Sequence, residues 1–393
     1  MSSTLFTGIS ELHTVSERGV INNGAVIIQD GTIQWVGPAA EAPAADQEID
    51  CEGRAVLPGW VDSHTHMIFA GDRSQEFAAR MAGEDYAAGG IAVTMNATRE
   101  AGEHALTELL KQRIRDAHAG GTTTIETKTG YGLDTQSEAL AARIAAAHVD
   151  DVTFLGAHLV PPGADPDTYL DEVCGPMLDA VAPHAQWIDV FCERGAFNEE
   201  QSRRVLRAGQ ARGLKPRVHG NQLGEGSGVQ LAVELGAASV DHVNYINDED
   251  IDALANSDTV ATVLPACDLS TRQPLAPART LLDAGAHLAI ASNLNPGTSY
   301  TSSMNFCVGT AVLQMHLSLE EAIRAGTSGG ARALERHNVG NGLDPQGRPA
   351  KGTLVEGAAA DLHVLRSPHA IDLAYRPGMP MSHQTYRAGR RVA

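Results

Sequence analysis

The chain has 393 residues, enough for two to three average domains or for one large α/β barrel with a smaller added domain. Its 43% hydrophobic and 20% charged residues are typical of a folded globular protein and exclude disordered, collagen-like and disulfide-scaffold chains. The formal net charge of -19 would repel nucleic acid phosphates and anionic membrane surfaces, so we expect neither as a partner.

The two ends of the chain carry strand-like sequence. Residues 25–36 contain two β-rich runs joined by Asp30-Gly31, a dipeptide that favours the left-handed backbone of a tight hairpin. We therefore expect the two ends to pair in a composite β-sandwich domain of residues 1–55 and 350–393. The strand-like or turn-forming segments near the far end are residues 351–355, 360–365 and 387–391.

Between these ends, short β-rich runs alternate with longer helix-forming stretches. Eight such units occur, which is the number that closes a (β/α)8 TIM-type barrel, so the sequence predicts an α/β barrel over residues 56–349. Periodicity alone would also fit an open parallel sheet. The β-rich runs are residues 61–66, 122–128, 152–158, 187–192, 216–219, 239–242, 260–264 and 288–292.

Some connecting stretches differ in character. Residues 199–212 and 318–324 mix polar and apolar side chains as surface helices do. The first unit is unusually long, and its Gly-rich, polar insert at residues 71–98 predicts an active-site loop instead of a helix.

Cysteine usage and the N-terminal residues indicate the compartment. The five cysteines are odd in number and contain no C-x-x-C pair, which predicts neither a disulfide framework nor a thiolate zinc site. Residues 1–15 lack a basic start and an apolar core, and no apolar run reaches the roughly 18 residues of a membrane span. We expect a cytoplasmic protein.

Histidines stand at the ends of several predicted strands. His64 and His66 are two residues apart, so both rings can reach one ion from the same side of a strand, and His219 and His242 end later strands. Taken alone, an H-x-H pair could equally be solvated or core histidines. Four together predict a metal site at the carboxyl ends of the barrel strands, where such barrels hold their active sites.

Imidazole ligands suit zinc and iron, and a catalytic site commonly uses three protein ligands and leaves a position for water. The ion lowers the pKa of that water, and a neighbouring group must take and return its proton. His242 and His158 are candidates for that proton transfer. Their alternative role is hydrogen bonding that orients the metal ligands.

The sequence resembles the amidohydrolase superfamily through His64, His66, His219, His242 and the Ala-Asp-Leu of residues 360–362. More closely, it resembles the imidazolonepropionases of histidine degradation over almost the whole chain. The segments that carry this second resemblance are residues 69–73 (FAGDR), 127–134 (TKTGYGLD), 154–158 (FLGAH), 189–193 (DVFCE) and 295–297 (NPG).

The resemblance implies ring opening of 4-imidazolone-5-propanoate with water to give N-formimidoyl-L-glutamate, using one Zn2+ or Fe ion. It also implies that barrels of this kind are often homodimers. For the small anionic heterocyclic substrate, Arg73 offers a bidentate fork to the carboxylate, although it could equally be a surface ion pair. The substrate-contacting residues that the resemblance implies are Tyr131, His158, Gln222, Asn295, Gly297 and Thr298. The alternative role of Tyr131 is to anchor its loop.

One position departs from the superfamily pattern. The eighth strand of these barrels normally ends in an aspartate that binds the metal and accepts the proton of water, and here that position is Asn293. An amide is a poorer ligand and accepts no proton near neutral pH. The resemblance therefore implies a catalytic and metal-binding position at Asn293 that is impaired.

Three explanations of Asn293 remain open: an engineered inactivating change, a natural relative with another proton acceptor and a related substrate, or a metal-binding protein without catalysis. A related substrate would be an imidazolone, a hydantoin or a thio-substituted ring that bears a carboxylate arm. The alternatives of other classes are a deaminase and a non-enzymatic metal-binding scaffold.

Overall fold

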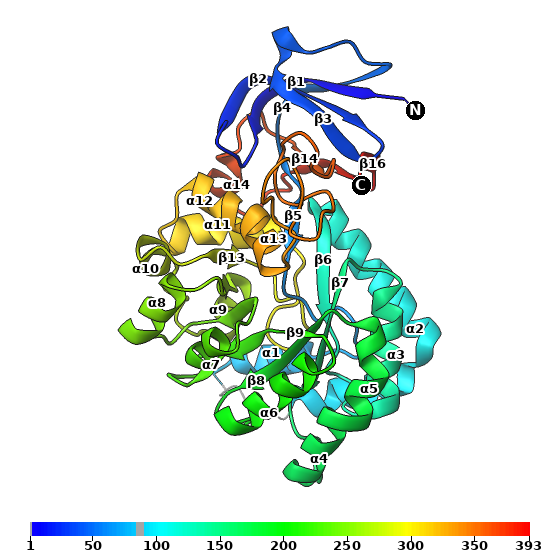
Figure 1. The fold of residues 1–393 in the computed structure, drawn as a ribbon, viewed down its shortest axis with the longest axis vertical. Coiled ribbons are helices and arrows are strands. Elements are labelled where there is room, and N and C mark those ends of the chain that lie inside the picture. The colour runs from blue at the N-terminus through cyan, green and yellow to red at the C-terminus, as the bar shows by residue number, and fades with distance from the viewer. Residues whose placement is uncertain (1, 84–89) are drawn as a thin grey trace.

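Strands from both ends of the chain form one seven-stranded sheet, which lies at the top of Figure 1 together with both termini. The structure, a computed structural model, describes residues 2–83 and 90–393. The order across the sheet is β16-β15-β14-β4-β1-β2-β3. These strands are β1 (Thr4–His13), β2 (Val20–Gln29), β3 (Thr32–Pro38), β4 (Gln47–Pro58), β14 (Leu362–Leu365), β15 (Ser382–Arg387) and β16 (Arg390–Arg391).

The sheet confirms the expected hairpin and corrects one expected strand. Asp30 and Gly31 join β2 to β3 with φ values of 52° and 79°, the left-handed geometry of a two-residue turn. Residues 351–355 form no strand. They run as a loop across the turn that follows β1, where the Leu354 N–H donates to the Thr14 carbonyl at 2.8 Å.

The barrel below the sheet contains the eight parallel strands that the sequence predicts, in chain order around the wall. Closure comes from the segments that follow the first and last strands: Asn293 N–H donates to His64 O at 3.0 Å, and His66 N–H donates to Leu294 O at 2.8 Å. The strands are β5 (Trp60–Asp62), β6 (Thr122–Lys128), β7 (Asp151–Ala157), β8 (Trp187–Cys192), β10 (Val218–Gly220), β11 (Ser239–His242), β12 (Val260–Val263) and β13 (Leu288–Ile290), with β9 (Lys215–Pro216) beside β8.

Helices surround the barrel in Figure 1, and both surface helices predicted from the sequence are present with capping boxes, at Asn198 for α6 and Ser318 for α12. None of the helices in the described ranges is long and apolar enough to cross a bilayer. The α-helices are α1 (Ser74–Met81), α2 (Ile91–Ala119), α3 (Thr135–Ala146), α4 (Pro166–Glu172), α5 (Leu178–Val181), α6 (Glu199–Gln210), α7 (Gly228–Glu234), α8 (Asp248–Ala255), α9 (Pro265–Thr271), α10 (Ala278–Asp283), α11 (Met304–Gln314), α12 (Leu319–Arg324), α13 (Gly330–Ala333) and α14 (Asp372–Tyr375).

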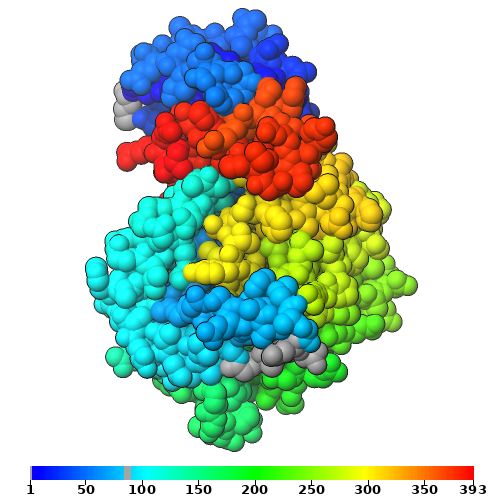
Figure 2. Space-filling view, turned by 180° about the vertical axis from the view of Figure 1, so that it is seen from behind, coloured from blue at the N-terminus to red at the C-terminus, as the bar shows by residue number. Residues whose placement is uncertain are grey.

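The long insert after β5 is not a loop throughout, so that expectation was wrong. It contains α1 and the start of α2, while residues 84–89 lie outside the described part. The reason is local: α1 is rich in good helix formers, and its buried Arg80 donates to the Gly297 carbonyl at 3.1 Å. In Figure 2 this light-blue segment lies across the barrel beside the yellow segment that contains Gly297.

One buried histidine joins the sheet to the barrel. His363 of β14 packs edge-on against Trp60 of β5, with ring centroids 5.5 Å apart, and its Nε2 lies 2.8 Å from Ser382 Oγ. Gly121 makes room for this ring, because a Cβ built at that glycine would lie 2.5 Å from the imidazole.

Candidate active site

Four histidines converge at the carboxyl ends of the barrel strands, as the sequence predicts. His64 and His66 follow β5, His219 lies in β10 and His242 ends β11, and all four are buried. The Nε2 atoms of His66 and His219 are 3.4 Å apart. The ring centroids of His64 and His219 are 4.5 Å apart, and those of His219 and His242 are 5.5 Å apart. These rings therefore share one small space.

Carboxylates behind two of these rings fix their orientation. His64 Nδ1 lies 2.7 Å from Asp241 Oδ2, and His219 Nδ1 lies 3.0 Å from Asp189 Oδ2. A neutral imidazole that donates Nδ1–H to a carboxylate has its lone pair on Nε2, which is the atom a metal needs. Burial lowers the pKa of His64, His66 and His242 well below the usual range, which favours their neutral, metal-binding form.

A buried lysine and a buried arginine balance these carboxylates. Lys128 Nζ, at the end of β6, lies 3.0 Å from Asp189 Oδ2 and 3.1 Å from Glu126 Oε1, and Arg217 Nη2 lies 3.3 Å from Asp241 Oδ2. Burial raises the pKa of Asp189 and Asp241, but the nearby positive groups lower it more, so the net shift is downward for both. Both carboxylates therefore remain ionised acceptors for the histidines.

Several buried polar atoms in this space lack a hydrogen-bond partner in the described part of the chain. They include His64 Nε2 and Asn293 Oδ1. An unsatisfied buried polar atom is costly, and two beside the converging rings call for a shared partner. A metal ion satisfies lone pairs of this kind, so the residues present fit one ion.

Asn293 occupies the position that the sequence predicts for the last ligand. It follows β13 with a left-handed φ of 52°, a conformation that asparagine tolerates better than most residues. Its backbone N–H donates to His64 O, which joins the segment after β13 to the segment that carries His64, and Asn293 lines the cavity with the other histidines. The side chain also hydrogen-bonds the Cys267 thiol.

A cavity of about 80 Å³ lies above the histidines and contains nearly all of the predicted substrate residues. Gly297 does not line it but contacts a residue that does, since a Cβ on Gly297 would lie 2.5 Å from Arg73 Nη1. Sequence reasoning missed the apolar part of the wall, because such side chains look like ordinary core residues. The cavity is lined by His66, Arg73, Ile91, Tyr131, His158, Leu159, Phe191, His219, Gln222, Leu223, His242, Asn293, Asn295 and Thr298.

Arg73 lies in this wall with its fork engaged by an acidic residue. Its Nε and Nη2 donate to the two carboxylate oxygens of Glu76, at 2.8 and 2.7 Å. The guanidinium is buried, which distinguishes it from the surface ion pair that the sequence left open. A substrate carboxylate would therefore meet an arginine that Glu76 already holds in place.

The loop that carries Tyr131 is fixed by one buried carboxylate. Glu138 of α3 accepts the N–H groups of Gly130, Gly132 and Leu133 at 2.7 to 2.8 Å. The same loop orients His158, whose Nδ1 lies 2.9 Å from the Gly130 carbonyl. A carbonyl only accepts, so His158 donates from Nδ1 and its Nε2 is an acceptor. Burial lowers the pKa of His158 to about 4.

Asn295 and Gln222 line the cavity but also make contacts within the protein. Asn295 Oδ1 accepts the N–H groups of Gly297 and Thr298 at 2.9 and 2.8 Å, so this side chain shapes the loop after β13. The backbone N–H of Gln222 donates to the Glu193 carboxylate, and its side-chain Nε2 lies 3.9 Å from Cys267 Sγ.

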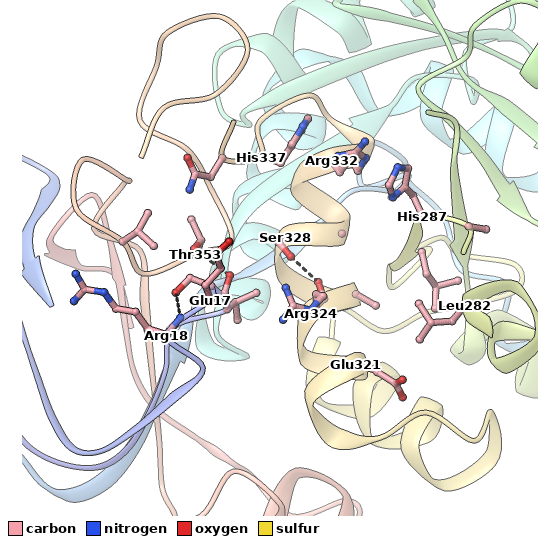
Figure 3. A pocket seen from close by; sticks show the side chains of 18 residues that line it. Glu17, Arg18, Leu282, His287, Glu321, Arg324, Ser328, Arg332, His337 and Thr353 are labelled. Carbon is pink, nitrogen blue, oxygen red and sulfur yellow. Dashed lines mark hydrogen bonds between the residues drawn. The ribbon is translucent and has the colours of Figure 1, made fainter. Parts of the chain in front are cut away.

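A larger cavity of about 730 Å³ lies elsewhere, between the turn after β1 and the segment from α12 to α13 (Figure 3). None of the predicted site residues lines it, and the labelled side chains, such as Arg18, Arg324 and His287, come from both the sheet and the barrel. The size of a cavity therefore does not locate the chemistry here.

Comparison with known proteins shows what the whole chain is similar to. No family model matches the chain. An imidazolonepropionase of Saccharopolyspora erythraea is 62% identical over 393 residues, covering 100% of this chain and 99% of that protein. The imidazolonepropionase of Paenarthrobacter aurescens is 61% identical over 405 residues, covering 100% and 98%.

Solved structures with much lower identity share the fold. An adenosine deaminase from Xanthomonas campestris with bound zinc has a TM-score of 0.72 at 18% identity, covering 99% of this chain and 92% of that one. A mutant atrazine chlorohydrolase from Arthrobacter aurescens, complexed with zinc and atraton, has a TM-score of 0.73 at 18% identity, covering 99% and 94%. At this identity the likeness concerns the fold alone.

Proposed function

The chain belongs to the imidazolonepropionase family of metal-dependent hydrolases that act on carbon–nitrogen bonds, and we propose how its residues open the ring of 4-imidazolone-5-propanoate to give N-formimidoyl-L-glutamate. The observation that carries the proposal is the convergence of oriented histidines beneath a small cavity lined by Arg73, Tyr131 and His158.

We assign the metal to His64, His66 and His219, with the amide oxygen of Asn293 as a weak further ligand. The carboxylates behind His64 and His219 and the unpartnered Asn293 Oδ1 support this set. When bound, the Zn2+ or Fe ion supplies Lewis acidity and a water of lowered pKa. Elemental analysis of the purified chain decides between the two metals.

Two neutral histidines are available for proton transfer. In the reaction, the water oxygen bonds to the ring carbonyl carbon, the carbon–nitrogen bond breaks, and the leaving nitrogen gains a proton. His242, with its unpartnered Nδ1 at the end of β11, and His158, with its acceptor Nε2 just after β7, both line the cavity and can take and return that proton. Asn293 cannot, so the rate is reduced relative to a chain with aspartate there.

The substrate contacts follow from the cavity wall. Arg73, held by Glu76, faces the carboxylate arm, while Tyr131, His158 and Gln222 contact the ring and its arm. Asn295, Gly297 and Thr298 shape the loop that closes the wall. A related imidazolone, hydantoin or thio-substituted ring with the same arm is the second candidate, and the observation that favours it is Asn293.

The test is an assay of 4-imidazolone-5-propanoate hydrolysis before and after removal of the metal with a chelator. We expect turnover that chelation abolishes and that added Zn2+ or Fe restores. Release of ammonia from an amine substrate would instead indicate a deaminase. A chain that binds metal and turns over no imidazolone or hydantoin would contradict the proposal and favour the scaffold alternative.

Three further assignments belong to this proposal. We propose a homodimer, which exposed Phe306, Leu313 and Met379 beside a groove of about 410 Å³ support. A cytoplasmic location is supported by five free cysteines. We divide the chain into the composite sheet domain, residues 1–55 and 350–393, and the barrel, residues 56–349. Sedimentation equilibrium tests the dimer.

A further inference from the structure

A second group of metal-binding side chains adjoins the proposed active site. His242, Cys267 and Asp268 each place one potential ligand atom within 4.8 Å of the other two. All three side chains are buried, His242 at the end of β11 and the other two in α9. This group shares His242 with the histidine cluster but contributes a sulfur and a carboxylate that the assigned metal set does not use.

The Asp268 carboxylate of this group has no ion-pair partner in the described part of the chain, although Arg80 lies close enough to act electrostatically on Cys267. The Asp268 carboxylate accepts a long hydrogen bond from the Ala276 N–H at 3.4 Å and one from the Asn244 side chain. No lysine or arginine in the described residues forms an ion pair with it. A buried carboxylate without a cation is costly, and a bound cation would remove that cost.

Further atoms around the group also lack partners. His242 Nδ1 and Asn244 Oδ1 are both buried without a hydrogen bond among the described residues. Nitrogen, sulfur and carboxylate oxygen together are the donors of zinc and of its spectroscopic substitute cobalt, whereas magnesium and calcium take oxygen ligands.

We propose that His242, Cys267 and Asp268 form a second, weaker site for a thiophilic divalent cation of the zinc type, and that filling it inhibits the hydrolase. Cys267 releases its proton to solvent as the sulfur–metal bond forms. Inhibition follows because a cation on His242 removes that ring from proton transfer, and this part of the inference rests on the proposed function. Binding itself does not depend on it.

The experiment uses the full chain and Co2+ as the probe. After one equivalent of metal fills the first site, we expect further Co2+ to produce the near-ultraviolet charge-transfer absorption of a cobalt–thiolate bond. Equilibrium dialysis at excess Zn2+ should give two ions per chain. Cys267→Ser and Asp268→Asn should each reduce this to one ion, and Cys267→Ser should abolish the thiolate absorption.

Cys51→Ser is the matched control, because Cys51 is a buried thiol in the sheet domain, outside this group. It should keep two ions and the thiolate absorption. Inhibition is measured within each variant as the ratio of activity at excess Zn2+ to activity at one equivalent. We expect this ratio to be about 0.1 or lower in the unchanged chain and in Cys51→Ser. In Cys267→Ser it should be near one.

A single ion per chain and no thiolate absorption in the unchanged protein would overturn the inference. Equal stoichiometry in the unchanged chain and Cys267→Ser would also overturn it, and circular dichroism establishes that the variant is folded. Two other results would contradict the proposed function and not the second site. One is that His219→Ala still holds the first ion, and the other is that imidazolone turnover is absent at every metal concentration.

Discussion

At the scale of single residues, the proposed mechanism makes the rate depend on the side chain at position 293. The backbone around it holds the position firmly, since its N–H bonds His64 O and its φ is left-handed. Aspartate tolerates that conformation as asparagine does. Replacing the Asn293 amide with a carboxylate therefore changes the charge and basicity of this side chain and leaves the backbone conformation as it is.

Asn293→Asp should raise the turnover of 4-imidazolone-5-propanoate by about 100-fold or more, the scale of restoring a general base. Steady-state kinetics on metal-saturated protein measures this. Asn295→Asp is the control, since it adds a carboxylate to the same loop, where Asn295 Oδ1 already accepts two N–H groups. No gain in Asn293→Asp would indicate another ring substrate, and an equal gain in both variants would indicate a general charge effect.

Asp241→Asn should weaken metal binding by roughly 10- to 100-fold, because an amide no longer fixes His64 with Nδ1–H donated and Nε2 free. Competition with a chromophoric chelator measures the affinity. Asp344→Asn is matched, since Asp344 is a buried carboxylate that pairs with Arg348 and does not line the cavity. Unchanged affinity in Asp241→Asn would show that packing alone orients the ring.

The histidines of the site could be predicted from sequence, because strand ends in a barrel meet at one rim and the polar residues there stand out. The other cavity residues, such as Tyr131, Gln222 and Thr298, were implied only by the resemblance to imidazolonepropionases. The carboxylates behind the histidines could not be predicted in either way. Asp189 and Asp241 lie inside β8 and β11, where sequence does not show which buried charge faces which ring. The pairing of Arg73 with Glu76 was missed because the insert was interpreted as a loop, whereas a helical turn brings residues three apart together.

At the scale of elements, the short loop between β6 and α3 contains Tyr131, and the buried carboxylate of Glu138 holds this loop in place. Three backbone N–H groups converge on Glu138, so the loop geometry depends on one side chain from the following helix. Burial raises the pKa of Glu138, and hydrogen bonds from Thr129 and the loop backbone oppose this shift.

Glu138→Gln should destabilise the protein by about 1–3 kcal/mol, because the amide NH2 would face a backbone N–H that then has no acceptor. The looser loop should also raise KM for the imidazolone more than it lowers kcat. Thermal unfolding and kinetics measure the two effects. Glu172→Gln is the control, as this partly exposed carboxylate accepts from Thr135 at the start of the same helix. Similar effects in both variants would contradict the special role of Glu138.

The elements show where sequence patterns are informative. The eight β-rich runs were found because each is short and leads into a longer helix-forming stretch, and the two surface helices because residues 199–212 and 318–324 mix polar and apolar side chains. The prediction of a strand at residues 351–355 was wrong. These residues pack as a loop against Thr14, and a local sequence window does not contain that distant contact.

At the scale of the whole molecule, sheet and barrel are joined through His363, and burial lowers the pKa of this ring to about 3. Its unfolded-state pKa is near 6.5. Below that value the unfolded chain binds a proton that the folded chain does not, so the folded state loses stability as pH falls from about 6.5 toward 3.

The thermal midpoint should therefore fall less steeply between pH 6.5 and 4 in His363→Gln than in the unchanged chain. The difference corresponds to at most about 3 kcal/mol between pH 6.5 and 4, at 1.36 kcal/mol per pH unit. Scanning calorimetry at several pH values measures it. His104→Gln, at an exposed histidine in α2, should leave the slope unchanged. Parallel curves for His363→Gln and the unchanged chain would contradict the prediction.

The place of β14 between β4 and β15 has a consequence for how this protein is made. On the ribosome, β1 to β4 emerge first, while the strand that completes their sheet, Leu362–Leu365, is translated only after the whole barrel. The edge of β4 stays open during that interval, and an unpaired edge invites pairing with other chains. Nascent chains stalled before Leu362 should therefore need chaperone protection, which full-length chains no longer require.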